Sequence, residues 1–141
     1  MTNRNDEGTE DSVAEGFRAQ SLGVSLTVKD VRDSLRWYRD VVGFAVDQEH
    51  LQDGQLRAVS LTAGEVRFIV NQDDGAKGWD RRKGEGLSLY LTTEQDVDTI
   101  AARIEADGTE LVSQPADMPW GVRAFTVLDP DGFKLVIARP A

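Results

Sequence analysis

Apolar and polar residues alternate over residues 24–28, which read VSLTV. A period of two predicts a β-strand with one apolar face. Over residues 31–42 apolar side chains recur three to four positions apart, which predicts an amphipathic helix that Asp30 can cap and Gly43 can end. Turn dipeptides such as Asp53-Gly54 then predict three further strands, at residues 44–50, 56–61 and 66–71.

The same order of patterns returns in the second half of the chain. Residues 86–108 read GLSLYLTTEQDVDTIAARIEADG, and residues 23–43 read GVSLTVKDVRDSLRWYRDVVG. The second copy predicts a first strand at 87–91, a helix at 95–107, and strands at 110–113, 122–128 and 133–139. A unit repeated once in a short chain predicts two like modules that share a sheet.

Each first strand has one apolar face and one face of small or polar residues. The apolar face must lie under the helix of its module, so the other face points into the space that a curved sheet encloses. This second face comprises Gly23, Ser25 and Thr27 in the first module and Gly86, Ser88 and Tyr90 in the second. A helix-covered sheet with a small, polar concave face is typical of a ligand-binding site.

Composition narrows the class of protein. The 141 residues suit one domain, expected over residues 21–141, after a polar, aperiodic tail over 1–20 that is expected to be flexible. Module one is expected over 22–71, a Gly-rich charged loop over 72–85, and module two over 86–139.

The net charge of −9 disfavours nucleic acid and anionic membranes as partners, and no apolar run is long enough for a membrane span. The lack of cysteine excludes disulfides and thiolate chemistry and agrees with a cytoplasmic location.

Four segments resemble the vicinal oxygen chelate superfamily, which includes glyoxalase I, bleomycin-resistance proteins and extradiol dioxygenases. They are VSLTVKDVRDSLRWYRDVVGF (24–44), SLYLTTEQDVDTIAARIEADG (88–108), PADMPWG (115–121) and DPDGFKLVI (129–137). The resemblance implies an α+β fold, in which two βαβββ modules form an incomplete, barrel-like mixed sheet with helices on its outer face. It points to a fold and not to one activity, because this superfamily hosts many chemistries.

The resemblance also implies where a metal would bind. Metal-using members of the superfamily take one ligand from the first strand and one from the last strand of each module, usually His and Glu. The corresponding positions here are Gly23, Gly86, Val136 and Phe68, with Ile69 as the alternative to Phe68. None of these side chains can bind a divalent metal, so we expect no metal and no cofactor, and no activity of the glyoxalase I or extradiol dioxygenase type. The four positions would instead leave a roomy, partly apolar cavity.

Candidate ligand-binding residues come from the concave face, from the former metal positions and from two loops. They are Ser25, Thr27, Phe68, Trp79, Ser88, Tyr90, Trp120 and Val136. Tyr90 could donate a hydrogen bond or stack on a ligand, although small polar residues can also line a solvated barrel without a specific task. Trp79 and Trp120 each either cover an apolar edge or form a stacking wall for a planar ligand. Trp37 lies in the first helix and is expected in packing. No catalytic residue is assigned.

Several charged residues have two possible roles, one structural and one in binding or catalysis. His50 is a general base by type, but without an evident orienting partner it is better explained as an exposed histidine at a strand end. Arg57, Arg67 and Arg123 either pair with carboxylates or, if one points inward, favour an anionic ligand. Residues 81–83, which read RRK, are either a solvated part of the loop or a clamp for a phosphate or carboxylate.

Two functions remain open. The first is a metal-independent small-molecule binding protein similar to bleomycin-resistance proteins, which would sequester a small cationic or planar ligand in the barrel pocket of a homodimer. The second is a lyase, isomerase or oxidoreductase of the glyoxalase or dioxygenase type, acting on a small organic substrate through non-standard catalytic residues or a metal placed elsewhere. Binding is favoured, because no positioned acid–base pair is evident.

Overall fold

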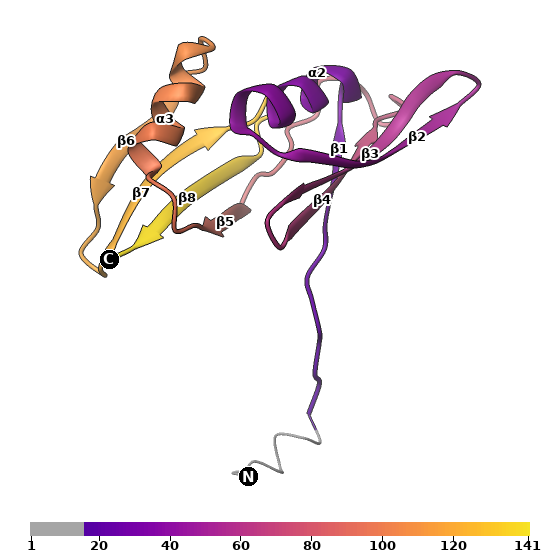
Figure 1. Ribbon diagram of the computed structural model, residues 1–141. Helices are drawn as coiled ribbons and strands as arrows, with labels where there is room; N and C mark the ends of the chain where they lie inside the picture. The colour runs from indigo at the N-terminus through magenta and orange to yellow at the C-terminus, as the bar shows by residue number, and fades with distance from the viewer. Residues whose placement is uncertain (1–15) are drawn as a thin grey trace.

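Two βαβββ modules make up the described part of the chain, residues 16–141 of this computed structural model (Figure 1). Module one consists of β1 (Val24–Val28), α2 (Val31–Arg36), the π-helical turn η1 (Trp37–Val42), β2 (Ala45–Gln52), β3 (Gln55–Ala63) and β4 (Val66–Gln72). Module two consists of β5 (Ser88–Thr92), α3 (Val97–Ala106), β6 (Leu111–Asp117), β7 (Val122–Leu128) and β8 (Lys134–Pro140). The expected α+β fold is confirmed. Of the expected tail, residues 1–15 lie outside the described part, and residues 16–20 form no helix or strand.

Each module forms its own four-stranded sheet. The strand orders are β1-β4-β3-β2 and β5-β8-β7-β6. The first strand of each module runs parallel to the last one, and the other neighbouring strands are antiparallel. Between residues 16 and 141 no strand of one sheet pairs with a strand of the other. The strands therefore form two open sheets, and not the one shared sheet that the repeat predicts, because the edge strands of the two modules do not pair.

Capping residues determine where the two helices begin. The Asp30 side chain accepts hydrogen bonds from two backbone N–H groups in the first turn of α2, at 3.0 and 3.3 Å. Asp96 does the same for α3 with one N–H group, at 3.2 Å. Gly43 ends η1 with a φ of 109°, a conformation that favours glycine. No helix between residues 16 and 141 is long and apolar enough to span a membrane.

Strand β6 is longer than the sequence pattern predicts. A strand over 110–113 and a loop from Pro115 are expected, whereas β6 continues to Asp117. The pairing of β6 with β7 is irregular between Ser113 and Ala116. Proline cannot donate a ladder hydrogen bond, and such an irregularity on an edge strand lets the strand continue past it.

An aromatic cluster fills the core of module one between its sheet and its helix. The ring centroids of Tyr38 and Phe68 lie 5.7 Å apart, those of Phe44 and Phe68 5.2 Å apart, and those of Tyr38 and Phe44 5.3 Å apart. The side chains of Tyr38 and Phe68 are at most 1% exposed. Such contacts fix how the helix lies on the sheet, because aromatic rings bury large areas in specific orientations.

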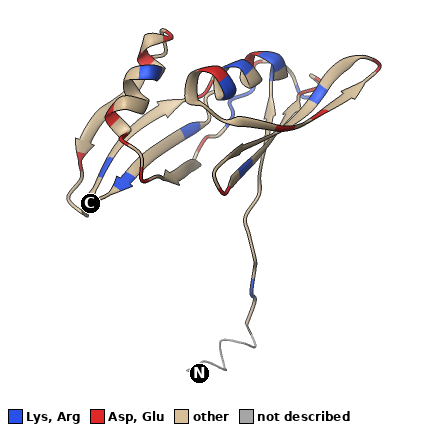
Figure 2. Cartoon of the chain, in the orientation of Figure 1, with Lys and Arg blue, Asp and Glu red and all other residues tan. Residues whose placement is uncertain are grey.

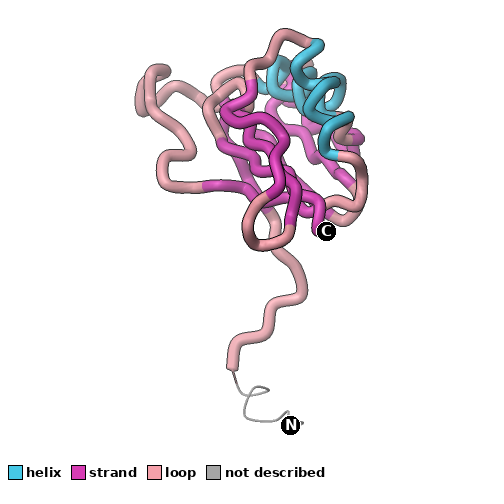
Figure 3. Tube along the Cα trace, turned by 90° about the vertical axis from the view of Figure 1, so that its left-hand side faces the viewer, coloured by secondary structure: helices cyan, strands magenta, loops and turns pink. Residues whose placement is uncertain are grey.

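The two modules contact each other mainly through their helices, which lie next to each other in Figure 3. The indole Nε1 of Trp37 donates to the hydroxyl of Thr109 at 3.1 Å. The guanidinium of Arg103 on α3 donates to the backbone carbonyl of Asp40 in η1, also at 3.1 Å. Trp37 is 3% exposed, which confirms its expected role in packing. The opposite face of each sheet carries no helix and is called the open face below.

A buried carboxylate joins the modules at the turn before β8. Asp129 is 4% exposed and accepts a hydrogen bond from the Tyr38 hydroxyl at 2.7 Å. It also accepts from the backbone N–H groups of Asp131 and Phe133, at 2.9 and 2.8 Å. Burial raises the pKa of the Asp129 carboxyl above its ordinary value, although these hydrogen bonds oppose the shift. Burial, and then the nearby Asp129, raise the pKa of Tyr38.

Lys83 connects the loop over 72–85 to both modules. Its ammonium donates to the Thr27 carbonyl and to the Asp73 carboxylate, each at 2.9 Å, and lies 3.5 Å from the Asp131 carboxylate. Its side chain is only 8% exposed. A charge buried to this extent needs partners, and acceptors from both modules supply them. This lysine is therefore structural and is not available to a ligand.

The Lys83–Asp73 pair makes stability depend on pH in the acid range. Hydrogen bonds from Lys83 and from the backbone of Gly75 lower the pKa of Asp73 to about 2. A carboxyl whose pKa is lower in the folded state contributes stability above its unfolded pKa and loses it as the pH falls to its folded pKa. We therefore expect Asp73→Asn to be less stable than the wild type at pH 7, with a difference that shrinks between about pH 4 and pH 2.

Urea unfolding at several pH values between 7 and 2 would measure this difference, with Asp80→Asn as the control. Asp80 is exposed in the same loop, so its replacement should leave the wild-type profile unchanged. A constant difference between Asp73→Asn and the wild type at all pH values would contradict the assignment.

Candidate functional site

The open face of module one carries small polar side chains. Ser25 and Thr27 lie on it, because they alternate in β1 with the buried residues of the strand. Their partners across the parallel pair are Ile69 and Asn71 of β4. The Asn71 amide donates to the Ser25 hydroxyl at 2.8 Å. The expected concave position of Ser25 and Thr27 thus agrees with their placement, whereas Asn71 was missed because the sequence does not reveal the β1–β4 register.

His50 lies on the same open face and is not at the end of its strand. Ala58 of β3 pairs with His50 on one side and with Asn71 on the other, so Thr27, Asn71, Ala58 and His50 form one row across the sheet. The imidazole is exposed, and no hydrogen bond to it is found among residues 16–141. No residue in the described part of the chain orients the imidazole by a hydrogen bond.

The open face of module two combines an aromatic ring with aliphatic and basic neighbours. In the parallel pair of β5 and β8, Ser88 pairs with Lys134 and Tyr90 pairs with Val136. Tyr90 is 54% exposed, and Val136 is partly exposed beside it. A large exposed ring next to small residues gives a surface on which a planar molecule can stack. Lys134 was missed, although the alternation of β8 places it on this face.

Phe68 does not lie on the open face, so its expected place in the cavity is wrong. It pairs with Val24 and packs under the helix against Tyr38 and Phe44. The next residue, Ile69, is 38% exposed on the open side. The physical reason is the strand alternation: a shift of one residue moves a side chain to the other face of the sheet.

The strand registers also correct which residue in module one corresponds to Val136. Tyr90 occupies the place in β5 that Thr27 occupies in β1, four residues after the glycines at 86 and 23. Tyr90 pairs with Val136, and Thr27 pairs with Asn71. The counterpart of Val136 is therefore Asn71, whose amide is already bonded to Ser25 and to a backbone carbonyl.

The two loop tryptophans differ in how they are held. The Trp79 ring packs so closely over Gly75 that a Cβ at that glycine would overlap it. Trp79 is nevertheless 49% exposed, so one part of the ring covers its own loop and the rest faces solvent. Trp120 lies between β6 and β7 and is 67% exposed, which leaves its ring available for stacking. The structure brings neither ring into the rows of Tyr90 and Ser25.

The three strand arginines lie in different places. Arg67 pairs with Thr62 and lies on the open face of module one, 3.9 Å from the carboxylate of Asp47. Arg123 lies on the helix-covered face of β7, because it alternates with the open-face residues of that strand. It binds the Asp98 carboxylate at 2.8 and 2.9 Å, which raises the pKa of Arg123. Arg57 is exposed near the start of β3. Of Arg67 and Arg123, whose faces the strand pairings give, Arg67 lies on an open face.

The superfamily's metal does not fit these residues. Gly23, Gly86 and Val136 offer no donor atom in their side chains, and the amide of Asn71 is engaged. Over residues 16–141 no group of three or more His, Cys, Asp or Glu side chains is arranged to hold a metal ion. No step of any mechanism is therefore assigned to a metal in this protein.

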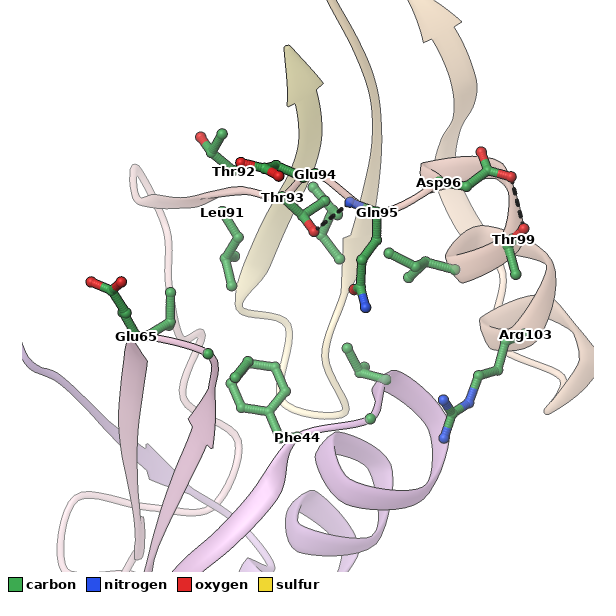
Figure 4. Close-up of a pocket in the computed structure, with 17 residues that line it drawn as sticks. Phe44, Glu65, Leu91, Thr92, Thr93, Glu94, Gln95, Asp96, Thr99 and Arg103 are labelled. Atoms are coloured by element: carbon green, nitrogen blue, oxygen red, sulfur yellow. Dashed lines mark hydrogen bonds between the residues drawn. The ribbon is translucent and has the colours of Figure 1, made fainter.

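A cavity of about 810 Å³ lies elsewhere, between the two modules on the helix-covered side (Figure 4). Phe44 and Leu91 contribute apolar walls, and the Gln95 side chain points into the space between them. Glu65 and Arg103 stand on opposite sides of the opening. An apolar wall with charged groups at the rim could take a small amphipathic molecule.

Several of the polar groups around this cavity already serve the fold. Asp96 caps α3 and also accepts from the Thr99 hydroxyl at 2.8 Å. Arg103 binds the last turn of η1, and the Thr93 hydroxyl accepts from the backbone N–H of Gln95 at 3.1 Å. The Gln95 and Glu65 side chains line the cavity without such a bond to residues 16–141, so a small polar molecule would fit there. We nevertheless place the functional site on the open faces, because the half-exposed ring of Tyr90 lies there.

The family comparison agrees with the fold. The model of the Glyoxalase/Bleomycin resistance protein/Dioxygenase superfamily matches residues 21–137. The chain belongs to this superfamily. A search of the curated proteins finds no match.

Among solved structures, TioX from Micromonospora sp. ML1 is 23% identical, with a TM-score of 0.71 over 87% of this chain and 100% of TioX. TnmS3, an antibiotic binding protein from Streptomyces sp. CB03234, is 22% identical, with a TM-score of 0.68 over 88% of this chain and 98% of TnmS3. Lactoylglutathione lyase from Agrobacterium tumefaciens is 15% identical, with a TM-score of 0.63 over 86% of this chain and 94% of the lyase. An antibiotic binding protein and a lyase thus share this fold, and the activity must be argued from the site.

Proposed function

We propose that this superfamily member binds a small planar organic molecule, without a resident metal, over the open faces of its sheets. The observation that carries the proposal is Tyr90, a half-exposed aromatic ring on the open face beside Ser88 and Val136. An aromatic ring exposed to this extent on a sheet face supplies stacking area, and its hydroxyl supplies a hydrogen bond. TnmS3, an antibiotic binding protein of the same fold, supports small-molecule binding as a function of this fold.

We further propose that the binding form is a homodimer. Both sheets leave one face without a helix, and apolar side chains are exposed there, including Ile69, Tyr90 and Leu128, which are 38%, 54% and 41% exposed. Such surfaces on a small soluble protein are typical of binding or association sites. A second copy that faces these sheets would enclose a ligand, which a single open sheet cannot do.

The charges on the open faces disfavour the cationic ligand that the negative net charge suggests. Acidic and basic residues are spread over both modules (Figure 2). The open faces, however, carry the basic residues Arg67 and Lys134. A net charge of −9 describes the whole chain, whereas a ligand is attracted or repelled by the charges that lie within about 10 Å of it.

A thermal-shift screen of planar aromatic compounds, organic acids and cationic glycopeptides tests the proposal. We expect planar compounds to raise the melting temperature, and Tyr90→Ala to weaken their binding by about fivefold to tenfold, since a ring contact contributes about 1 kcal/mol. Leu51→Ala is the control, because Leu51 is 57% exposed but pairs with buried Leu56 and not with an open-face residue. Light scattering with and without the bound compounds measures the molar mass and therefore shows whether the protein is a dimer.

Equal binding to wild type and Tyr90→Ala would overturn the proposed site. Conversion of the hits into products by the wild type, lost in His50→Gln, would instead support the enzymatic alternative. That alternative is a lyase, isomerase or oxidoreductase that uses His50, the imidazole on the open face of module one.

A further inference from the structure

A second hollow, of about 480 Å³, lies at the end of the open face of module two. The end of the 72–85 loop, Gly86–Ser88 and the start of β8 line it, with Arg82, Lys83 and Lys134 as its basic members. Ser88 belongs both to this hollow and to the row of the open face that leads to Tyr90. The hollow therefore opens directly onto the proposed ligand site.

Gly86 keeps the hollow open. No atom lies within 4 Å of the position where a Cβ at Gly86 would stand, and its φ is +77°. Gly132 on the opposite side has a φ of +97°. Since L side chains rarely adopt such conformations, both positions favour glycine and leave room for a group brought by a ligand.

The charges around the hollow oppose the charge of the whole protein. Lys134 is exposed, and no acidic partner of it is found among residues 16–141. Arg82 has only a solvent-exposed contact with Glu85, at 3.4 Å. Lys83 is compensated by Asp73 and Asp131 and adds no free charge. Glu85 is the acidic member of the lining, so Arg82 is shared between Glu85 and a ligand, and Lys134 is the free cation among the described lining residues. In a protein of net charge −9, this local excess of basic side chains favours an anionic group.

The spacing of the rows matches a planar acid. Ser88 and Lys134 form one row of the sheet, and Tyr90 and Val136 form the next row on the same face. Two residues along a strand span about 6–7 Å, so a planar ring that covers Tyr90 can reach the hollow with an acidic group attached to its edge. An anionic group in the hollow would thus leave the ring over Tyr90.

We infer that the hollow at Gly86 is a subsite for the carboxylate or phosphate of the bound molecule, with Lys134 and Arg82 as its charge partners. This inference rests on the proposed function and names the class of its ligand: a planar organic anion. The guanidinium of Arg82 can bind either group in a bidentate manner, and the Ser88 hydroxyl can donate a hydrogen bond to it.

The test compares four probes on the full chain by isothermal calorimetry: naphthoate, naphthyl phosphate, the neutral naphthylmethanol and inorganic phosphate alone. We expect the two naphthyl anions to bind more tightly than the neutral compound, and inorganic phosphate to compete with them. The preferred anion shows whether the subsite takes a carboxylate or a phosphate. Lys134→Met and Arg82→Met should each weaken the anions about threefold to fivefold and leave the neutral compound unchanged.

Arg139→Met is the matched control, because Arg139 is exposed on the same strand as Lys134 but on the other face of the sheet. It should change each affinity less than about twofold. Circular dichroism confirms that the variants fold. If naphthylmethanol binds as tightly as the anions and depends on Tyr90, the proposed function stands and the anion subsite is wrong. If no probe binds, both are wrong for planar ligands of this class.

Discussion

Phe68→Ala is expected to destabilise the protein by about 3–5 kcal/mol, the largest effect of any single substitution proposed for this chain. The side chain is 1% exposed, and its ring lies within 5.7 Å of Tyr38 and 5.2 Å of Phe44, measured between ring centroids. Its removal would leave a cavity at the contact of sheet and helix, because the two remaining rings cannot both move into the space. Urea unfolding followed by tryptophan fluorescence measures the change.

Ile69→Ala is the natural control, since Ile69 is the next residue and is 38% exposed on the open face. It should cost less than about 1 kcal/mol. The pair also tests the corrected placement of the two residues. A small loss of stability for Phe68→Ala, together with a loss of ligand binding, would mean that Phe68 does line the ligand site.

Asp129→Ala is expected to have the second largest effect, about 3–4 kcal/mol of destabilisation. The carboxylate accepts hydrogen bonds from the Tyr38 hydroxyl and from the backbone N–H groups of Asp131 and Phe133. Alanine would leave all three donors without an acceptor in a region where Asp129 itself is 4% exposed. Buried donors that lose their partner cost more than the hydrogen bond contributed, because water does not replace it.

Tyr38→Phe distinguishes the stability contributed by the Tyr38–Asp129 bond between the modules from that contributed by the bonds of Asp129 within the turn before β8. It removes one hydrogen bond and leaves the two backbone donors of the turn satisfied by Asp129, so it should cost about 1–2 kcal/mol. The measurement is again urea unfolding at pH 7. A cost for Tyr38→Phe equal to that of Asp129→Ala would show that the tyrosine bond alone carries the effect, contrary to the structure.

Local patterns predicted most of the fold. The alternation in β1 and β5, the helical spacing after Asp30 and the glycines that end each helix identify two βαβββ modules, and the structure has both. β6 exceeds its predicted length because an irregular pairing lets an edge strand continue past Pro115, which the residue pattern does not reveal. The π-helical turn η1 was not predicted, because its apolar spacing is close to that of an α-helix.

The candidate site was predicted less completely. Ser25, Thr27, Ser88 and Tyr90 lie on open faces as expected, because alternation within one strand is a local property. Asn71 and Lys134 were missed, and Phe68 was misplaced. Their positions depend on the register between a first strand and the last strand of its module, which many residues separate in the sequence.

The sequence by itself determined the duplicated fold and the lack of metal-binding side chains at Gly23, Gly86 and Val136, because both depend on residue identity and local periodicity. The tertiary structure decided which residues meet. It buried Phe68, paired Val136 with Tyr90, engaged Lys83 in the fold, and kept the hollow at Gly86 open beside Lys134. Strand register and the packing of helices on sheets are collective properties, since each depends on the whole set of contacts between distant segments.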